Sequence, residues 1–118
     1  MNSQQLQVTS TTGKLLIVDD EPNILSSLKR CLIKTPFEVF TANSAQEGLA
    51  IMQEHSIQVV LSDFRMPIMS GAEFIEQIKT SYPDVISMVL SGYADFDSAI
   101  SLLNSGAAHK FLRKPWNS

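Results

Sequence analysis

Cysteine, tryptophan and long apolar runs are scarce in this chain of 118 residues, which contains one cysteine and one tryptophan. A single thiol, Cys31, cannot close an internal disulfide, so the chain is not a disulfide-stabilised secreted scaffold. No apolar stretch approaches the roughly 18 residues of a membrane-spanning helix. The N-terminus lacks the charged start and apolar centre of a signal peptide. We therefore expect a cytoplasmic protein without a membrane segment.

Clustered positive charge is also missing. Nine basic and twelve acidic residues leave a net charge of −3, and no basic block offers nucleic acid an electrostatic footprint. We therefore expect no direct binding of nucleic acid. Apolar residues at 44% and charged residues at 18% match an ordinary folded domain with one core.

Short apolar runs alternate with helical patterns after a polar start. Residues 1–13 are predicted to form a flexible N-terminal tail, and residues 14–118 a single domain. Strands are expected at residues 14–18, 37–41, 57–61, 85–90 and 107–112. Helices are expected from Pro22 to before Pro36 and at residues 44–55, 70–81 and 96–105. This alternation predicts an α/β fold, a doubly wound five-stranded parallel sheet with helices on both faces.

The helix boundaries carry capping signals. Ser44 and Ser70 each precede a glutamate by three residues, which is the spacing of a capping box. Asp95 or Asp97 is expected to cap the last helix, and Gly106 to end it. In the first helix an apolar stripe is predicted to face the sheet, its cysteine serving as a small core residue rather than a reactive thiol. That stripe comprises Ile24, Leu25, Leu28, Cys31 and Leu32.

Polar residues collect where the predicted strands end. The carboxyl ends of parallel strands meet at one edge of a sheet, and open α/β folds bind ligands at that edge. Four of the five strands contribute a polar group there. These residues are Asp19, Asp20, Asp63, Ser91 and Lys114.

Three of these residues are carboxylates, and their mutual repulsion requires a cation. At about 4 Å and an effective dielectric near 20, each pair costs on the order of 4 kcal/mol. Oxygen ligands without histidine or cysteine select a hard ion, Mg²⁺ or Mn²⁺. A carboxylate beside such an ion and a lysine can attack a phosphoryl group and give an aspartyl phosphate. Lys114 and the Ser91 hydroxyl would then neutralise further phosphoryl oxygens.

Each residue taken alone also fits a structural role. Asp19 or Asp20 fits a helix N-cap, Ser91 before a glycine fits a turn, and Lys114 fits a solvated surface position. Phe111, near the end of the last strand, fits the core. The combination at one edge favours a phosphoryl site over these separate roles.

Four motifs resemble those of a known family. They are Leu-Ile-Val-Asp-Asp-Glu-Pro from residue 16, Leu-Ser-Asp-Phe-Arg-Met-Pro from residue 61, Leu-Ser-Gly-Tyr from residue 90, and Phe-Leu-Arg-Lys-Pro-Trp from residue 111. In this order they resemble the receiver domain of two-component response regulators, over about residues 14–116. The resemblance implies a flavodoxin-like sheet with the strand order 2-1-3-4-5.

The resemblance also implies a role for each residue at the sheet edge. Asp63 would be the phosphoacceptor and a ligand of Mg²⁺. Asp20 would bind the ion directly, and Asp19 largely through water. The backbone carbonyl of Arg65 would complete the protein ligands.

Further roles follow from the same resemblance. Lys114 would contact the phosphoryl group, while Ser91 would move toward it and Phe111 would turn inward as the switch aromatic. Arg65 and Tyr93 occupy positions that tune phosphoryl lifetime in such receivers, and their bulk predicts a long-lived phosphoryl group. Receivers catalyse only their own phosphorylation and dephosphorylation, so we expect no enzyme acting on a separate substrate.

The implied partners are a phosphoryl donor and a recipient of the signal. The donor would be a sensor histidine kinase or a phosphotransfer protein, and the recipient an output domain or a downstream protein. Receivers usually carry a fifth helix after Lys-Pro-Trp, and this chain ends two residues after Trp116. We expect that helix to be absent, so either the chain is a piece of a longer regulator or something else covers the face that the helix would cover. The stripe around Leu25, Leu28 and Leu32 would otherwise be partly exposed, and self-association through it is the alternative to the chain being such a piece.

Three other functions fit less well. A phosphorylation-independent interaction module of the receiver type is the main alternative, but it would normally lack an acid or the lysine, and none is missing. A flavin or nucleotide binder needs a Gly/Ser/Thr-rich loop after the first strand, where this chain has Asp-Asp-Glu-Pro. A phosphatase with an aspartate nucleophile would have a second acid at the position of Arg65.

Overall fold

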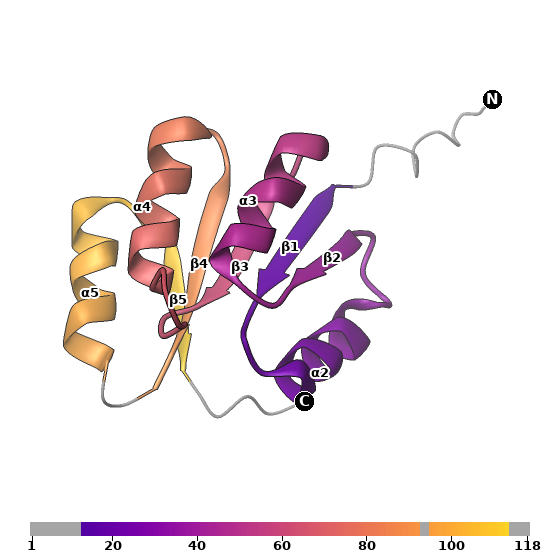
Figure 1. The fold of residues 1–118 in the computed structure, drawn as a ribbon, viewed down its shortest axis with the longest axis horizontal. Coiled ribbons are helices and arrows are strands. Elements are labelled where there is room, and N and C mark those ends of the chain that lie inside the picture. The colour runs from indigo at the N-terminus through magenta and orange to yellow at the C-terminus, as the bar shows by residue number, and fades with distance from the viewer. Residues whose placement is uncertain (1–12, 93–94, 114–118) are drawn as a thin grey trace.

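The computed structural model describes residues 13–92 and 95–113. Within them lies a wholly parallel five-stranded sheet of order β2-β1-β3-β4-β5, which confirms the prediction (Figure 1). Its strands are β1 (Lys14–Val18), β2 (Glu38–Ala42), β3 (Val59–Asp63), β4 (Ile86–Ser91) and β5 (Lys110–Arg113). The predicted tail lies outside the described residues except for Gly13.

Four helices connect the strands in the described part of the chain. They are α2 (Pro22–Leu32), α3 (Ala45–Glu54), α4 (Gly71–Ser81) and α5 (Phe96–Ser105). Among the described residues, no helix combines the length and the apolar character needed to cross a lipid bilayer.

Helices cover both faces of the sheet (Figure 1). On one face α3, α4 and α5 pack over a core that contains Leu16 of β1 and Phe74 of α4, both fully buried. On the other face Leu28 of α2 packs with Ile17 of β1. Successive residues of β1 therefore enter different cores, as expected for a strand buried on both faces.

Four strands begin one to three residues later than predicted. Ile57, Val85 and Ala107 are buried, yet they precede the hydrogen-bonded ladder. An apolar sequence pattern indicates which residues are buried and not which residues pair in the sheet. The predicted strand starts were therefore too early. Two of these strands, β3 and β4, also end later than predicted, at Asp63 and Ser91, so the ladder itself holds both residues.

One prediction about α2 is wrong, and the predicted partial exposure of its apolar stripe is confirmed only for Leu25 and Leu32. Cys31 is exposed instead of lying in the core, because it sits on the rim of the apolar stripe. Leu28, at the centre of the stripe, is 1% exposed and is not part of an open patch. Leu25 and Leu32 are half-buried. Self-association through this stripe stays a prediction. The stripe offers a partner less exposed apolar surface than expected, because Leu28 is buried.

The capping boxes are confirmed at α4 and in part at α3. Ser70 Oγ accepts the Glu73 N–H at 3.1 Å, and Glu73 Oε1 accepts the Ser70 N–H at 3.0 Å. Ser44 Oγ likewise accepts the Glu47 N–H at 3.1 Å. The Glu47 carboxylate, however, accepts the N–H of Asn43 at 2.6 Å, one residue before the predicted donor.

Two described residues adopt a left-handed backbone. Gly106 ends α5 with a φ of 83°, as predicted. Ile68, in the loop between β3 and α4, has a φ of 72°. The Met69 N–H donates to the Pro67 carbonyl at 2.8 Å, so Ile68 is the central residue of a strained γ-turn. Its β-branched side chain is fully exposed, and no packing offsets the strain.

Replacing Ile68 with glycine is expected to raise the free energy of unfolding by about 1 kcal/mol, because strain is removed and no contact is lost. Urea denaturation measures this difference. Ile33→Gly is the matched control, since Ile33 is also exposed but has a φ of −65°. Glycine at that position should lower the free energy of unfolding. Equal effects of the two substitutions would contradict the strain at Ile68.

Candidate functional site

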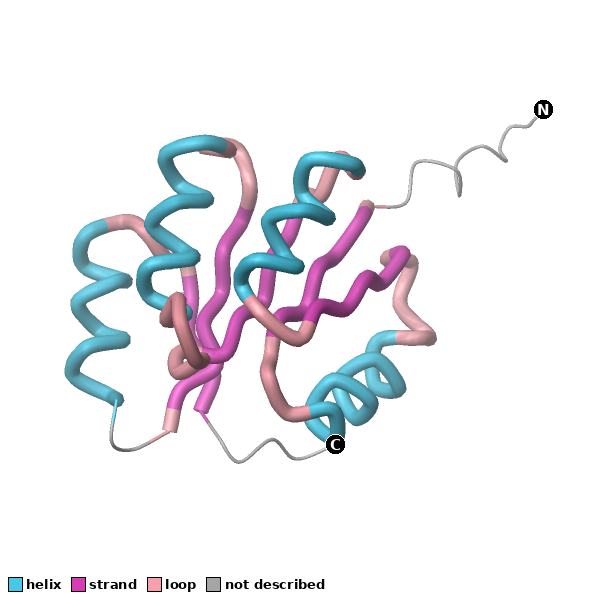
Figure 2. The backbone as a smooth tube through the Cα atoms, viewed as in Figure 1, coloured by secondary structure: helices cyan, strands magenta, loops and turns pink. Residues whose placement is uncertain are grey.

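Asp63 ends β3, and the sheet fixes its position. The register pairs Asp63 with Leu90 of β4, and the Phe64 N–H donates to the Leu90 carbonyl at 2.9 Å. The Asp63 side chain is 6% exposed. The predicted phosphoacceptor is thus nearly buried at the carboxyl edge of the sheet, the end at which β1 and β3 run into their connecting loops (Figure 2).

Asp19 and Asp20 follow β1 directly. Parallel pairing sets Val18 beside Ser62, which brings Asp19 level with the end of β3. Asp19 is 1% exposed, and its Oδ1 accepts the N–H of Glu21 at 2.9 Å. Asp20, by contrast, is exposed. The turn after β1 therefore offers one buried and one solvent-facing carboxylate.

The three carboxylates form one cluster. Oxygens of Asp19, Asp20 and Asp63 all lie within 4.8 Å of one another. The structure thus brings together the acids that the sequence placed at this edge. A set of oxygen donors with one solvent-facing member fits a hard divalent cation that keeps several waters, such as Mg²⁺ or Mn²⁺.

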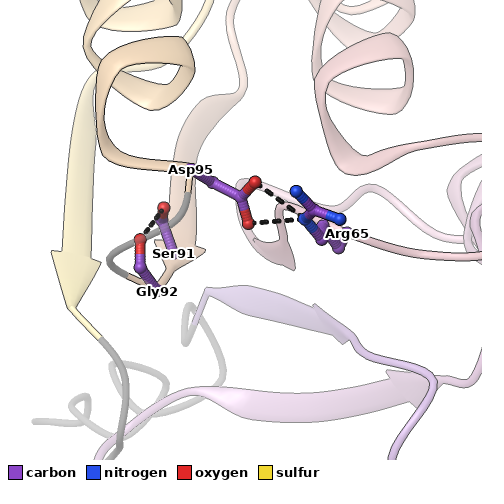
Figure 3. A network of polar contacts seen from close by, with 4 residues as sticks. All are labelled: Arg65, Ser91, Gly92 and Asp95. Atoms are coloured by element: carbon purple, nitrogen blue, oxygen red, sulfur yellow. Dashed lines mark hydrogen bonds and ion pairs between the residues drawn. The ribbon is translucent and has the colours of Figure 1, made fainter.

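Ser91 ends the neighbouring strand, β4, and is 1% exposed. It follows Leu90, the partner of Asp63 in the ladder, so it lies one step beyond the acceptor at the same edge. Its Oγ donates to the Gly92 carbonyl oxygen at 3.1 Å (Figure 3). A buried hydroxyl beside the acidic cluster is thus engaged with a local backbone carbonyl.

The loop between β3 and α4 packs tightly on the end of β3. The Gly71 N–H donates to the Phe64 carbonyl at 2.9 Å. A Cβ atom at Gly71 would clash with the backbone carbonyl oxygen of Asp63, so only glycine fits this approach. The first residue of α4 is therefore anchored on the acceptor residue itself.

Arg65 and Asp95 join the loop after β3 to α5. Arg65 Nε lies 2.7 and 2.9 Å from the two carboxylate oxygens of Asp95 (Figure 3). Asp95 is at the N-cap of α5, as predicted, but makes no side-chain cap hydrogen bond. Sequence analysis missed this pair, because nothing in a linear pattern relates residues that are 30 positions apart.

A groove of about 480 Å³ adjoins the acidic cluster. Asp20, Arg65, Asp95 and Ser98 are among its lining residues. The exposed member of the cluster and the ion pair therefore face the same solvent-filled space.

Phe111, the predicted switch aromatic, is half-buried on β5. Its ring centroid lies 5.5 Å from that of Phe96, and the two rings are inclined by 72° in an edge-to-face contact. Phe111 therefore touches the first residue of α5 as well as the core.

A sequence profile described as the response regulator receiver domain matches residues 15–118. The chain belongs to this family. It is similar to the hydrogenase transcriptional regulatory protein HoxA of Cupriavidus necator, with 34% identity over 86% of this chain and 21% of HoxA. It is also similar to the DNA-binding transcriptional regulator NtrC of Salmonella typhimurium, with 32% identity over 89% of this chain and 22% of NtrC.

The fold of this receiver agrees with solved receiver structures. A response regulator receiver domain from Clostridium thermocellum superimposes with a TM-score of 0.82 at 40% identity, covering 89% of this chain and 84% of that one. The receiver spans about a fifth of the length of HoxA and NtrC.

Two predicted site residues of the receiver, Lys114 and Tyr93, lie outside the described residues. Trp116, the last residue of the Lys-Pro-Trp motif, does so as well. The roles given to Lys114 and Tyr93 stay predictions.

Gly71→Ala is expected to lower the free energy of unfolding by about 2–3 kcal/mol, because the new methyl group would press on the backbone of Asp63. Gly92→Ala is the matched control at the same sheet edge, since a Cβ there would meet nothing within 4 Å. It should change stability by less than about 0.5 kcal/mol. Similar denaturation curves for both variants would contradict the tight anchoring of α4.

Proposed function

We propose that this receiver accepts a phosphoryl group on Asp63 from the phosphohistidine of a sensor histidine kinase or a phosphotransfer protein. The observation that carries the proposal is the cluster of Asp19, Asp20 and Asp63, with carboxylate oxygens within 4.8 Å of one another. Such a cluster is repulsive without a cation and suits phosphoryl chemistry with one. Membership of the receiver family supports the same role.

In the proposed reaction a carboxylate oxygen of Asp63 attacks the phosphorus atom. An O–P bond forms while the P–N bond to the donor imidazole breaks, and the imidazole nitrogen keeps the electron pair. The ladder around Asp63 supports this step, because it fixes the position of the backbone that carries the nucleophile. Since histidine kinases draw the phosphoryl group from ATP, we place the reaction in the cytoplasm.

Asp19, Asp20 and Asp63 would hold Mg²⁺ or Mn²⁺, together with the backbone carbonyl of Arg65. When bound, the cation supplies positive charge that offsets the carboxylates and the phosphoryl oxygens. Lys114 would neutralise a further phosphoryl oxygen.

Ser91 and Phe111 would carry the signal away from the site. The Ser91 hydroxyl donates to the Gly92 carbonyl, so a move toward a phosphoryl group exchanges a neutral acceptor for a charged one. Phe111 would turn inward and give up its contact with Phe96. The recipient would be an output domain or a downstream protein. The names of HoxA and NtrC favour an output in transcription control.

Arg65 and Tyr93 would give the phosphoryl group a long lifetime. Arg65 lines the groove beside Asp20, where its side chain would hinder an attacking water molecule. A half-time of minutes or longer is expected, and a half-time of seconds would contradict this proposal.

Intact mass after incubation with acetyl phosphate and Mg²⁺ tests the proposed function. The wild type is expected to gain one phosphoryl group, and Asp63→Asn none, because the nucleophilic oxygen is lost. Omission of Mg²⁺ should abolish the gain.

Asp84→Asn is the matched control, since Asp84 is an exposed carboxylate before β4, at the other end of the sheet. It should be phosphorylated like the wild type. If no variant gained mass, the phosphorylation-independent interaction module would be favoured. A gain of one phosphoryl group by Asp63→Asn would show that the phosphoacceptor is a residue other than Asp63.

A further inference from the structure

One ion pair links the acceptor loop to α5. Arg65, two residues beyond Asp63, places its Nε 2.7 and 2.9 Å from the carboxylate oxygens of Asp95 (Figure 3). The Arg65 side chain is 73% exposed, whereas that of Asp95 is 12% exposed. The arginine is therefore the partner with room to move, and the aspartate is the fixed one.

Asp95 occupies the N-cap of α5 without capping it. Ser44 and Ser70, the N-caps of α3 and α4, both have a ψ of 161°, and each accepts a backbone N–H. Asp95 has a ψ of 10° and makes no side-chain cap hydrogen bond. An aspartate at this position normally accepts an N–H of the first turn. The bond to Arg65 thus holds the carboxylate away from α5.

The pair shares a groove with the acidic cluster. Asp20, Arg65, Asp95 and Ser98 all line this space of about 480 Å³. A phosphoryl group on Asp63 would add on the order of one to two negative charges beside it. Guanidinium groups form strong charge-assisted hydrogen bonds with phosphate oxygens. The phosphoryl group and Asp95 would therefore be rival anions for Arg65.

We propose that Asp95 is a positioning residue that withholds Arg65 from the phosphoryl group, and that it caps α5 once Arg65 leaves. The inference rests on the proposed function, because the rival anion is the phosphoryl group on Asp63. An ion pair that is weakened by phosphorylation favours the unphosphorylated state, and after phosphorylation Asp95 still competes with the phosphoryl group for Arg65. When Arg65 leaves Asp95 for the phosphoryl group, Asp95 becomes free to cap α5, so phosphorylation changes the hydrogen bonding of the first turn of this helix.

Decay of the phosphorylated protein tests the withholding role. Asp95→Asn removes the charge but keeps a side chain able to cap a helix, so Arg65 is released. The phosphoryl half-time should then lengthen about twofold to fivefold, the range that an exposed ion pair supports. Arg65→Gln should shorten it. The double variant should match Arg65→Gln alone, because Asp95 acts through Arg65.

Asp97→Asn is the matched control for this measurement. Asp97 lies in the first turn of α5 and is exposed, and the Arg65 ion pair does not involve it. The half-time of Asp97→Asn should equal that of the wild type. If the loss of any negative charge at this end of α5 changed the phosphoryl half-time, Asp95→Asn and Asp97→Asn would change it equally.

Amide hydrogen exchange of α5 in the unphosphorylated protein tests the capping role. In Arg65→Gln the released Asp95 carboxylate can accept the N–H of Asp97 or Ser98. These amides should exchange about twofold to tenfold more slowly than in the wild type. Asp95→Ala cannot cap the helix and should show no slowing.

Opposite shifts of the half-time in Asp95→Asn and Arg65→Gln, with slower exchange in Arg65→Gln, would support the inference. Shifts in the same direction are the signature of a merely structural ion pair and would overturn it, as would unchanged exchange in Arg65→Gln. If the wild type takes up no phosphoryl group, the proposed function fails and the positioning role fails with it.

Discussion

Repulsion among Asp19, Asp20 and Asp63 is the constraint on which the site depends. Like charges this close separate unless the backbone holds them or a cation joins them. Here the backbone contribution comes from the register of the central strands, which sets Val18 beside Ser62 and so aligns the ends of β1 and β3. Buried cores on both faces of the sheet support that register, because slippage by one residue would exchange the two apolar faces.

Two helices are tied to this edge of the sheet by different means. Gly71 anchors α4 by close backbone packing on Asp63, a contact that leaves no space for a side chain. The charge-assisted hydrogen bond between Arg65 and Asp95 ties α5 to the same loop. The backbone contact at Gly71 fixes the position of α4 relative to Asp63. The exposed ion pair can exchange partners at a small cost in free energy. The site thus combines a rigid attachment with a reversible one.

Much of the fold could be predicted because strands and helices differ in apolar period and because the caps are local signals. Asp63 and Ser91 were placed correctly at strand ends, since an apolar run followed by a polar residue marks the sheet edge. The features that could not be predicted depend on how distant segments pack together, which no local pattern encodes. Cys31 is exposed although it continues the stripe, and the carboxylate of Asp95 pairs with Arg65 instead of its own helix. The γ-turn at Ile68 was also missed, because no sequence rule places isoleucine at positive φ.

The effect of Mg²⁺ on unfolding tests most directly whether the acidic cluster is a cation site. Urea denaturation of the wild type and Asp20→Asn, each with and without Mg²⁺, gives the four free energies needed. We predict that Mg²⁺ stabilises the wild type, because it binds only the folded cluster, and that Asp20→Asn is the more stable protein without Mg²⁺ but gains little from the ion. Equal stabilisation of both proteins by Mg²⁺, or no stabilisation of the wild type, would contradict a cation site at the cluster of Asp19, Asp20 and Asp63.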